Sequence, residues 1–309
     1  DSEYIADRAR KLVEASGGIQ EAVTMSNLMG RIRAKLDNPQ SLRKIQTPWK
    51  SLNSVLRGGF MPGELIVLAA RPGLGKTALA ANVALSAAWR GMGVLFVSCE
   101  MSDESLGHRL ISRVGRIDGR FFREGMGVTP QIRGAIDAAI GQLEALPLSI
   151  VEKSTVPMCP REVRRLARGI KDLGLIVVDY LQLLHPDEKS TSREREVAEM
   201  SRAFKQMALD LQVPVLLLSQ LNRSSEEGKR EPRVSDLRES GAIEQDADII
   251  LLHTRDLDRA NARPDVKCIV GKSRSTGTGA SFLRFEKAFS EFTEGEAWAG
   301  RPAVQENDL

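Results

Sequence analysis

The feature that most constrains the fold of this chain is a short glycine-containing loop set between two different apolar patterns. The run E-L-I-V-L-A-A (64–70) has the near-continuous apolar character of a buried strand, and the stretch 76–90 repeats apolar residues at helical spacing. The loop between them reads R-P-G-L-G-K-T (71–77). A strand, a tight loop and a helix in this order gather backbone N–H groups and a positive helix end around one point, where phosphate can bind.

The loop ends in the general phosphate-loop pattern G-x-x-x-x-G-K-[ST], with Ala70 in place of the first glycine. In that pattern the lysine, here Lys76, reaches the β- and γ-phosphates of a nucleotide, and the hydroxyl of the next residue, here Thr77, holds Mg²⁺. We therefore expect ATP and Mg²⁺ as cofactors. The residues expected to bind ATP are Arg71, Pro72, Gly73, Gly75, Lys76, Thr77 and Ala78.

The rest of the chain alternates short apolar runs with longer helical patterns. Such runs are typical of strands buried on both faces of a mostly parallel sheet, with helices as crossovers. The stretches 266–274 and 280–286, joined by S-T-G-T-G, predict a hairpin at the edge of the sheet. We therefore predict an α/β fold, a mostly parallel twisted sheet flanked by helices, with a C-terminal edge hairpin. The expected strands are 64–70, 94–100, 148–152, 175–180, 213–220 and 247–253, and the expected helices are 76–90, 131–146, 160–172 and 194–212.

Two shorter regions flank this main domain, which we place at residues 41–289. Residues 1–40 have a helical pattern, with a second helix over 19–36 that ends before Asn38-Pro39. This region is short for a core of its own, so it packs either on its own chain or on a neighbouring copy, and the pattern leaves both open. Residues 290–309 are rich in Glu and Gly and are predicted to be a flexible tail.

Composition narrows the class of protein without fixing its partner. A net charge of +3 over 309 residues allows a nucleic-acid partner but does not demand one. Cys99, Cys159 and Cys268 are far apart in the sequence, which indicates neither a disulfide framework nor a zinc site and fits a reducing, intracellular setting. No apolar run approaches the length of a membrane span, so no membrane partner is expected.

Three polar residues stand at the carboxyl ends of predicted strands, the edge where open α/β sheets bind ligands. Asp179 follows L-I-V-V and is the candidate carboxylate for Mg²⁺, with a helix cap as the alternative. Glu100 ends V-L-F-V-S-C-E, where it could activate water beside the γ-phosphate or be an ordinary surface glutamate. Gln220 ends V-P-V-L-L-L-S-Q, where an amide could sense the γ-phosphate.

Basic residues in the C-terminal half also have two interpretations. The polar loop 221–237 either binds a nucleic-acid backbone or is an ordinary solvated charged loop. Lys272 and Arg274 are two residues apart in a predicted strand, so their side chains share one face. The pair could complete an ATP site, since arginine fingers often come from a neighbouring subunit, or it could be two exposed basic residues on a hairpin.

Several stretches together resemble the DnaB-type replicative DNA helicases, which are hexameric, RecA-like motors. These stretches are R-P-G-L-G-K-T-A, C-E-M after the second apolar run, V-V-D-Y-L-Q-L, L-S-Q-L-N-R and, above all, S-D-L-R-E-S-G-A-I-E-Q-D-A-D (235–248). The last stretch is the most specific, because no general nucleotide chemistry requires it. The resemblance runs from about residue 19 to about residue 286, and Ala70 agrees with the family's own form of the loop.

The resemblance implies an ATP-dependent DNA helicase with a DNA-stimulated ATPase. Such a protein hydrolyses ATP with Mg²⁺ at the subunit interfaces of a homohexameric ring, threads single-stranded DNA and unwinds duplex in the 5′ to 3′ direction. The implied partners are single-stranded DNA held through its backbone, the other subunits of the ring, and a primase or helicase loader. The implied location is the cytoplasm of a bacterial or phage-infected cell, in association with the nucleoid.

The same resemblance assigns roles to residues by position. Lys76 and Thr77 would contact phosphate and Mg²⁺, and Asp179 would be the Walker B acid. Glu100 would be the catalytic glutamate, and Gln220 would couple the ATP site to DNA.

The remaining implied roles involve neighbouring subunits and DNA. Lys272 and Arg274 would be donated to the γ-phosphate of the neighbouring subunit. Arg238, Glu239 and Gly241 match the loop that contacts the DNA backbone, with Glu239 acting through its backbone N–H because its carboxylate would repel phosphate. Residues 19–36 match the linker helix that docks on the adjacent subunit, which favours the intermolecular role for this helix.

Two departures from the family pattern are visible. The family has an N-terminal helical collar domain, which nothing in this sequence matches, so either the sequence is part of a longer protein or the protein does without a collar. The hairpin reads K-S-R-S-T-G, where the family more often has asparagine after the arginine.

Two other functions are compatible with a phosphate loop. The stretch 235–248 argues against a RecA-type recombinase. Glu100 and Asp179 together argue against a module that binds ATP without acting as a motor, for example a ring that loads another protein.

Overall fold

The computed structural model describes residues 23–38, 43–124, 129–152, 157–188, 190, 192–222, 230–237, 240–255 and 265–295. The chain divides into two units, residues 1–42 and 43–309. Along the described ranges, no helix is both long enough and apolar enough to cross a membrane.

The first unit contributes one described helix, α2 (Met25–Asp37). The Thr24 hydroxyl accepts a hydrogen bond from the backbone N–H of Asn27, so Thr24 is the N-cap of this helix. The helix covers the later part of the predicted 19–36 helix, whose first residues lie outside the described ranges. Its apolar side chains are exposed, and together with Val23 they make up six of the eight exposed large apolar side chains in the described residues: Val23, Met25, Leu28, Met29, Ile32 and Leu36.

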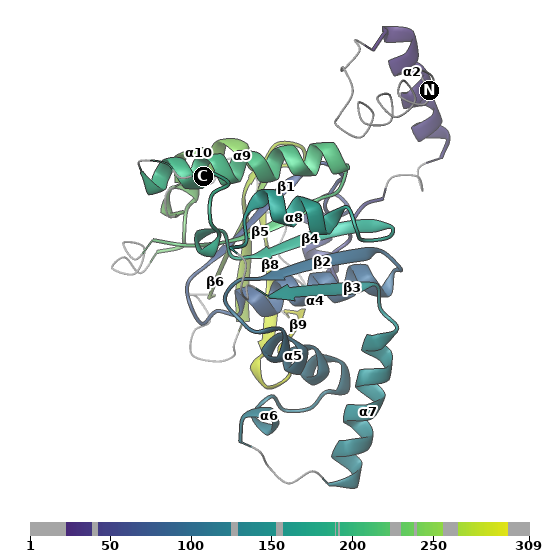
Figure 1. Cartoon of the computed structure of the whole chain (residues 1–309), viewed down its shortest axis with the longest axis vertical. Coiled ribbons are helices and arrows are strands. Elements are labelled where there is room, and N and C mark those ends of the chain that lie inside the picture. Colours follow the sequence, from purple (N-terminus) through teal and green to yellow (C-terminus); the bar gives the residue numbers. More distant parts are fainter. Residues whose placement is uncertain are drawn as a thin grey trace, which may run out of the picture. The chain divides into compact units, whose positions relative to one another are not determined.

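The second unit is built on a nine-stranded sheet with the order β3-β2-β4-β5-β1-β6-β7-β8-β9 (Figure 1). The pairings from β3 through β6 are parallel, and those from β6 to β9 are antiparallel. The strands are β1 (Leu65–Ala70), β2 (Gly93–Ser98), β3 (Leu148–Glu152), β4 (Leu173–Asp179), β5 (Val215–Gln220), β6 (Ile249–Arg255), β7 (Asp265–Ser273), β8 (Gly279–Glu286) and β9 (Glu291–Glu294).

Helices cover both faces of this sheet (Figure 1). Alternate residues of β1 pack into two cores, as expected for a strand buried on both sides. Ile66 and Leu68 pack with the α3 and α4 side, whereas Leu65 and Val67 pack with the α8, α9 and α10 side. The helices are α3 (Lys50–Val55), α4 (Lys76–Trp89), α5 (Asp103–Gly115), α6 (Arg120–Glu124), α7 (Pro130–Glu144), α8 (Pro160–Ala167), α9 (Arg193–Leu211) and α10 (Ser240–Asp246).

The predicted α/β class, the parallel sheet and the C-terminal hairpin are confirmed. The boundary of the tail is wrong at its start, because Glu291–Glu294 form β9 and this strand, rather than the hairpin, is the edge of the sheet. The side chain of Phe292 is only 2% exposed, and the indole N–H of Trp49 donates to its carbonyl oxygen at 2.9 Å. Burial of this phenylalanine explains why a Glu-rich segment is ordered there. Residues 296–309 of the predicted tail lie outside the described ranges.

Candidate nucleotide-binding site

The glycine-containing loop occupies the middle of the sheet, between β1 and α4. Ala70, the last residue of β1, is in register with Gln220 on β5 and with His253 on β6. Asp179 ends β4, which is the next strand beyond β5. The carboxyl ends of these parallel strands meet at one edge, so the structure brings the predicted polar residues around the loop.

Two glycines give the loop its shape. Gly73 has φ +80° and Gly75 has φ +84°, and Gly75 is the N-cap of α4. Both values lie in the left-handed region that favours glycine. A Cβ at Gly75 would lie 2.9 Å from the ring of Phe285, so this position also needs a residue without a side chain for steric reasons.

A buried histidine supports the loop from the neighbouring strand. The Nε2 atom of His253 is 2.8 Å from the carbonyl oxygen of Leu74, so Nε2 carries the proton and donates it. The side chain is fully buried, and this burial lowers the pKa of the imidazole to about 4. The sequence did not reveal this contact, because it depends on the register between β6 and β1.

Lys76, Thr77 and Asp179 form the centre of the site. The Thr77 hydroxyl donates to Asp179 Oδ2 at 2.6 Å, and Lys76 Nζ lies 3.8 Å from Asp179 Oδ1. The ammonium also lies 3.5 Å from the Ser219 carbonyl oxygen and 4.3 Å from the centre of the Tyr180 ring. The acid, which was predicted from one stretch of sequence, is therefore in contact with the lysine and the hydroxyl, which were predicted from another.

Burial governs the protonation chemistry of this group. It raises the pKa of the fully buried Asp179 carboxyl, against the lowering effects of Lys76 and of the Thr77 hydroxyl. Burial likewise lowers the pKa of the Lys76 ammonium, against the effects of Asp179 and Glu100. Among the described atoms, Asp179 Oδ1 is buried and has no hydrogen-bond partner. A carboxylate oxygen in this state beside a hydroxyl is a donor set that Mg²⁺ prefers, so the residues present fit this ion.

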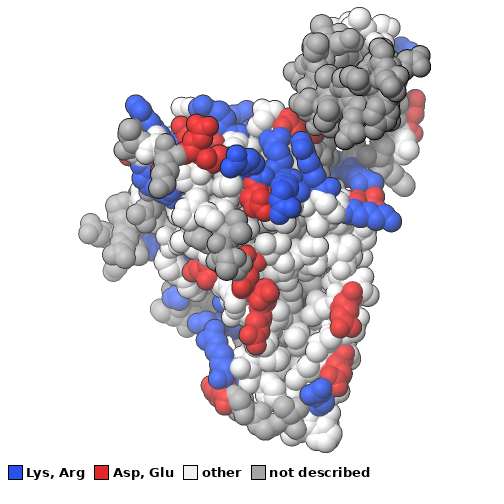
Figure 2. Space-filling model, in the orientation of Figure 1, with Lys and Arg blue, Asp and Glu red and all other residues white. Residues whose placement is uncertain are grey.

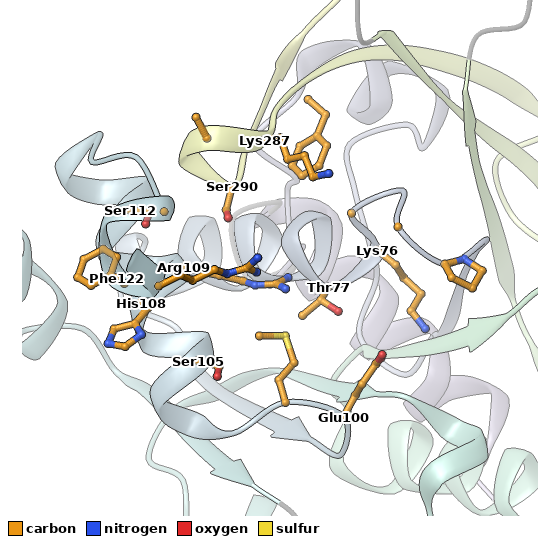
Figure 3. A pocket seen from close by; sticks show the side chains of 18 of the residues that line it. Lys76, Thr77, Glu100, Ser105, His108, Arg109, Ser112, Phe122, Lys287 and Ser290 are labelled. Atoms are coloured by element: carbon orange, nitrogen blue, oxygen red, sulfur yellow. The ribbon is translucent and has the colours of Figure 1, made fainter. Parts of the chain in front are cut away.

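The loop opens into a cavity of about 800 Å³. Glu100, Gln220 and Arg71 line it together with Lys76 and Thr77. Figure 3 shows that the side chains of Lys76 and Glu100 point into the same space from opposite sides. The other loop residues that line the cavity are Ala70, Pro72, Gly73 and Gly75. Of the residues predicted to bind ATP, only Ala78, which is buried in α4, does not line the cavity.

Four cationic residues that line the cavity were not predicted from the sequence: Arg109, Arg120, Arg123 and Lys287. Arg109 of α5 points into the space beside Thr77 (Figure 3), and burial lowers the pKa of its guanidinium. Asp179 and Glu100 act on it in the opposite direction. Ser105, Arg109 and Ser112 line the cavity from one face of α5. A polar stripe at helical spacing just after the predicted strand 94–100 was the signal that could have revealed it.

The predicted pair Lys272 and Arg274 does not line this cavity. Lys272 pairs with Ile250, and Ile250 pairs with Val67, which places it toward the amino end of β1 rather than at the loop. Lys272 Nζ donates to the carbonyl oxygen of Glu244, and Arg274 Nη2 donates to that of Gln245, both in the last turn of α10. The pair therefore lies toward the amino ends of the parallel strands, whereas the phosphate loop of the same chain lies at their carboxyl ends.

The predicted DNA-binding residues are only partly described. Arg238 and Glu239 lie outside the described ranges. Gly241 lies in the first turn of α10, and a Cβ there would meet no atom within 4 Å. The backbone at this position is accordingly open to a close approach.

A second group of cations lies on α8, where Figure 2 shows blue side chains gathered on the viewed face. Two of them are paired within the chain: Arg164 bonds to Asp210 at 2.6 Å, and Arg165 to Glu162 at 2.5 Å. Pairing with carboxylates reduces the attraction of these arginines for phosphate. The nucleotide cavity is therefore the candidate functional site.

Comparison with known proteins identifies the family. The family model described as the DnaB-like helicase C terminal domain matches residues 44–294. The replicative DNA helicase DnaB of Haemophilus influenzae is 37% identical over 270 residues, which cover 84% of this chain and 57% of that protein. The DnaB of Leifsonia xyli is 35% identical over 284 residues, which cover 89% of this chain and 61% of that protein. The chain thus spans little more than half the length of these relatives.

Solved structures agree with this result. One solved structure, described as an ATPase domain, superposes with a TM-score of 0.81 at 28% identity, covering 89% of this chain and all of that one. A DnaB-like replicative helicase, described together with its interactions with primase, superposes with a TM-score of 0.77 at 28% identity, covering 94% of this chain and 71% of that one. The RadB recombinase shares only the fold, with a TM-score of 0.54 at 19% identity over 82% of this chain and all of that one. The chain belongs to the family of proteins with the DnaB-like helicase C-terminal domain.

Proposed function

We propose that this chain is the motor of a replicative DNA helicase, which hydrolyses ATP and moves 5′ to 3′ along single-stranded DNA as a ring hexamer. The observation that carries the proposal is the separation of two parts of one ATP site. The loop, Asp179 and Glu100 lie at the carboxyl edge of the sheet, whereas Lys272 and Arg274 lie toward its amino edge. A ring in which each subunit offers one edge to the next brings the two parts together.

Five side chains in and beside the cavity take separate roles in hydrolysis in this scheme. Lys76 and Arg109 bind the phosphates, and Thr77 and Asp179 would hold Mg²⁺, which would stabilise the negative charge on the phosphoryl group that is transferred. Glu100 accepts a proton from the attacking water. The oxygen of that water bonds to the γ-phosphorus, and the bond to the bridging oxygen breaks to leave ADP.

The neighbouring subunit completes the site in this scheme. Arg274 and Lys272 of the next subunit neutralise the charge that develops on the γ-phosphate. The apolar face of α2 docks on an adjacent subunit and holds the ring together, since a helix with an exposed apolar face needs a partner surface. Residues 1–40 act as this linker, and residues 41–289 as the ATPase domain.

DNA binding couples to the site through the strand that ends at Gln220. Its amide lines the cavity and is followed directly by Leu221, which forms a β-bridge with Leu237. Arg238, Glu239 and Gly241 then hold the DNA backbone, so binding is independent of sequence and weakens with salt. A primase or a helicase loader is the further partner expected of such a motor, which would work at the nucleoid in the cytoplasm of a bacterial or phage-infected cell.

The experiment that tests this proposal is strand displacement on forked DNA with ATP and Mg²⁺. One fork carries only a 5′ tail for loading and the other only a 3′ tail, and Lys76→Ala serves as the inactive control. Unwinding of the 5′-tailed fork alone, with a loss of about a hundredfold or more in ATPase for Lys76→Ala, is the expected result. Absence of any ATPase activity in the unaltered protein would overturn the proposed motor function and favour a module that binds ATP without acting as a motor.

A further inference from the structure

Lys272 and Arg274 contact the end of α10 and the residue that precedes β6. The two side chains donate to the carbonyl oxygens of Glu244 and Gln245. The last carbonyls of a helix have no partner within the helix and form its negative end, so they attract cations. These contacts hold the pair but leave the Arg274 side chain 53% exposed.

A buried carboxylate faces the other side of Arg274. Asp248 Oδ1 lies 3.9 Å from Arg274 Nε, and the backbone N–H of Arg274 donates to the Asp248 carbonyl oxygen at 2.9 Å. The second carboxylate oxygen, Oδ2, accepts from the backbone N–H of Leu65 at 2.7 Å and from Lys205 Nζ at 2.6 Å. Lys205 also donates to the carbonyl oxygen of Gly63 at 2.9 Å. The carboxylate is therefore anchored to β1 and α9 at once.

We infer that Asp248 is the positioning residue of the finger Arg274: it holds the Nε side of the guanidinium while the terminal nitrogens exchange the Gln245 carbonyl for a phosphate oxygen of the neighbouring subunit. The inference rests on the proposed function, in which Arg274 acts on the next subunit. The nitrogens of the guanidinium have different partners, as this exchange requires. The anchored carboxylate faces Nε, whereas Nη2 is bound through a backbone oxygen that a phosphate can replace.

Orientation matters because an exposed arginine has many rotamers. A cation that must meet charge developing on the γ-phosphate is effective only if it is already aimed there. An anchored acid beside Nε restricts the side chain before the neighbour arrives. Loss of this acid therefore slows hydrolysis on the adjacent subunit and leaves nucleotide binding by its own loop unchanged.

The first test is Asp248→Asn in the full chain, assembled as rings. We expect an ATPase rate about ten- to hundredfold lower than that of the unaltered protein, because a misplaced group costs about this much. Titration of a fluorescent ATP analogue should give unchanged affinity. Asp210→Asn is the matched control, since Asp210 also pairs with an arginine, Arg164, but does not contact the finger.

Mixed rings separate a positioning role from a merely structural one. Asp248→Asn subunits keep an intact loop, and Lys76→Ala subunits keep an intact finger. In a ring assembled from equal amounts, about a quarter of the interfaces join an intact loop to an intact finger. We expect these mixtures to regain ATPase above the level of either variant alone. No regain would overturn the inference, because damage confined to the fold or to the variant's own loop cannot be repaired by a neighbour.

Two further measurements complete the test. A mixture of Arg274→Ala with Lys76→Ala must also regain activity; if it does not, the proposed action between subunits fails, whatever the role of Asp248. The double variant Asp248→Asn with Arg274→Ala should be no slower than Arg274→Ala alone, and an added loss would show that Asp248 acts elsewhere. If Asp248→Asn does not assemble, Lys205→Gln replaces it, since this change removes one of the two anchors of the carboxylate without touching Arg274. A loss of about three- to tenfold that mixing restores is then expected, and no loss would overturn the inference.

Discussion

The Nε2 atom of His253 lies 2.8 Å from the carbonyl oxygen of Leu74, and this hydrogen bond ties the middle of the phosphate loop to β6. The imidazole is fully buried and packs edge-on against Phe292, with ring centres 5.3 Å apart. A loop that must present its N–H groups to phosphate needs its carbonyl oxygens directed away from the ligand. His253 provides the donor that holds the Leu74 carbonyl in this direction.

His253→Leu is expected to destabilise the protein and to weaken nucleotide binding. The change leaves the Leu74 carbonyl without its donor, which costs about 1–3 kcal/mol in the free energy of unfolding. His253→Gln is the matched control, because its side-chain N–H₂ can still donate to this oxygen. Urea unfolding and titration of a fluorescent ATP analogue measure both effects. Equal losses in the two variants would contradict a role for the hydrogen bond.

The lowered pKa of the same histidine leads to a prediction about how stability depends on pH. Its pKa is about 4 in the folded chain and near 6.5 when unfolded, so the unfolded chain binds more protons between these values. The contribution of neutral His253 to the free energy of unfolding is therefore complete above about pH 6.5. It falls as the pH drops toward 4, by about 3 kcal/mol in total. Carboxylates contribute to acid unfolding too, so the quantity to measure is the difference between the unaltered protein and His253→Gln. A difference that stays constant from pH 7 to pH 4.5 would contradict the prediction.

The sequence predicted the parts of the site that follow directly from strand ends. Asp179, Glu100 and Gln220 each end an apolar run, and parallel strands bring their carboxyl ends to one edge. His253 also ends such a run, but its partner Leu74 depends on the register of β6 against β1, which no local pattern encodes. Arg109 was missed because α5, which carries it, was not among the expected helices, and because the direction of its side chain depends on which face of α5 turns to the cavity.

The fold was predictable for similar reasons, and prediction failed where local patterns are weak. The continuous apolar runs predicted the parallel strands, and helical spacing predicted α4, α7, α8 and α9. Helices α3, α5, α6 and α10 and the four-residue strand β9 were not predicted, and the shortest of these elements are ordered by tertiary contacts. The stacking of Phe285 on Phe292, with centres 4.3 Å apart, is one such contact, and it joins β9 to the wall of the phosphate loop.

Asp179→Asn is expected to abolish activity while preserving stability. The amide cannot hold Mg²⁺ as a carboxylate does, so the ATPase rate should fall about a hundredfold or more. Because burial raises the pKa of Asp179, the ionised carboxylate is costly in the nucleotide-free fold, and a neutral amide of the same shape relieves that cost. Lys76 lines the cavity and can turn its ammonium toward water, so this change does not leave it buried without a partner. The melting temperature should therefore be equal to or above that of the unaltered protein. Lys76→Ala is the opposite case, since it leaves Asp179 buried without its cation and should lower the melting temperature.

The two loop glycines provide a matched pair of substitutions. Gly73 and Gly75 have nearly the same positive φ, so alanine at either position carries a backbone cost of about 1–2 kcal/mol. Only at Gly75 does the added Cβ meet a neighbour, the Phe285 ring at 2.9 Å. Gly75→Ala should cost about 1–3 kcal/mol more than Gly73→Ala in urea unfolding. Equal costs would mean that the aromatic wall yields, and the steric argument would fail.

The exposed apolar face of α2 leads to a prediction about assembly. Met25, Leu28, Met29, Ile32 and Leu36 recur at helical spacing, and each is between 37% and 71% exposed. If this face docks on an adjacent subunit, Leu28→Glu with Ile32→Glu buries two unpaired charges at the interface, so the ring should dissociate and the ATPase should be lost with it. Ala34→Glu adds a charge to the opposite face of the same helix and should leave assembly intact. Size-exclusion chromatography with light scattering measures the result. Intact hexamers of the double variant would show that this face has no part in the ring, and the linker role of α2 would have to be abandoned.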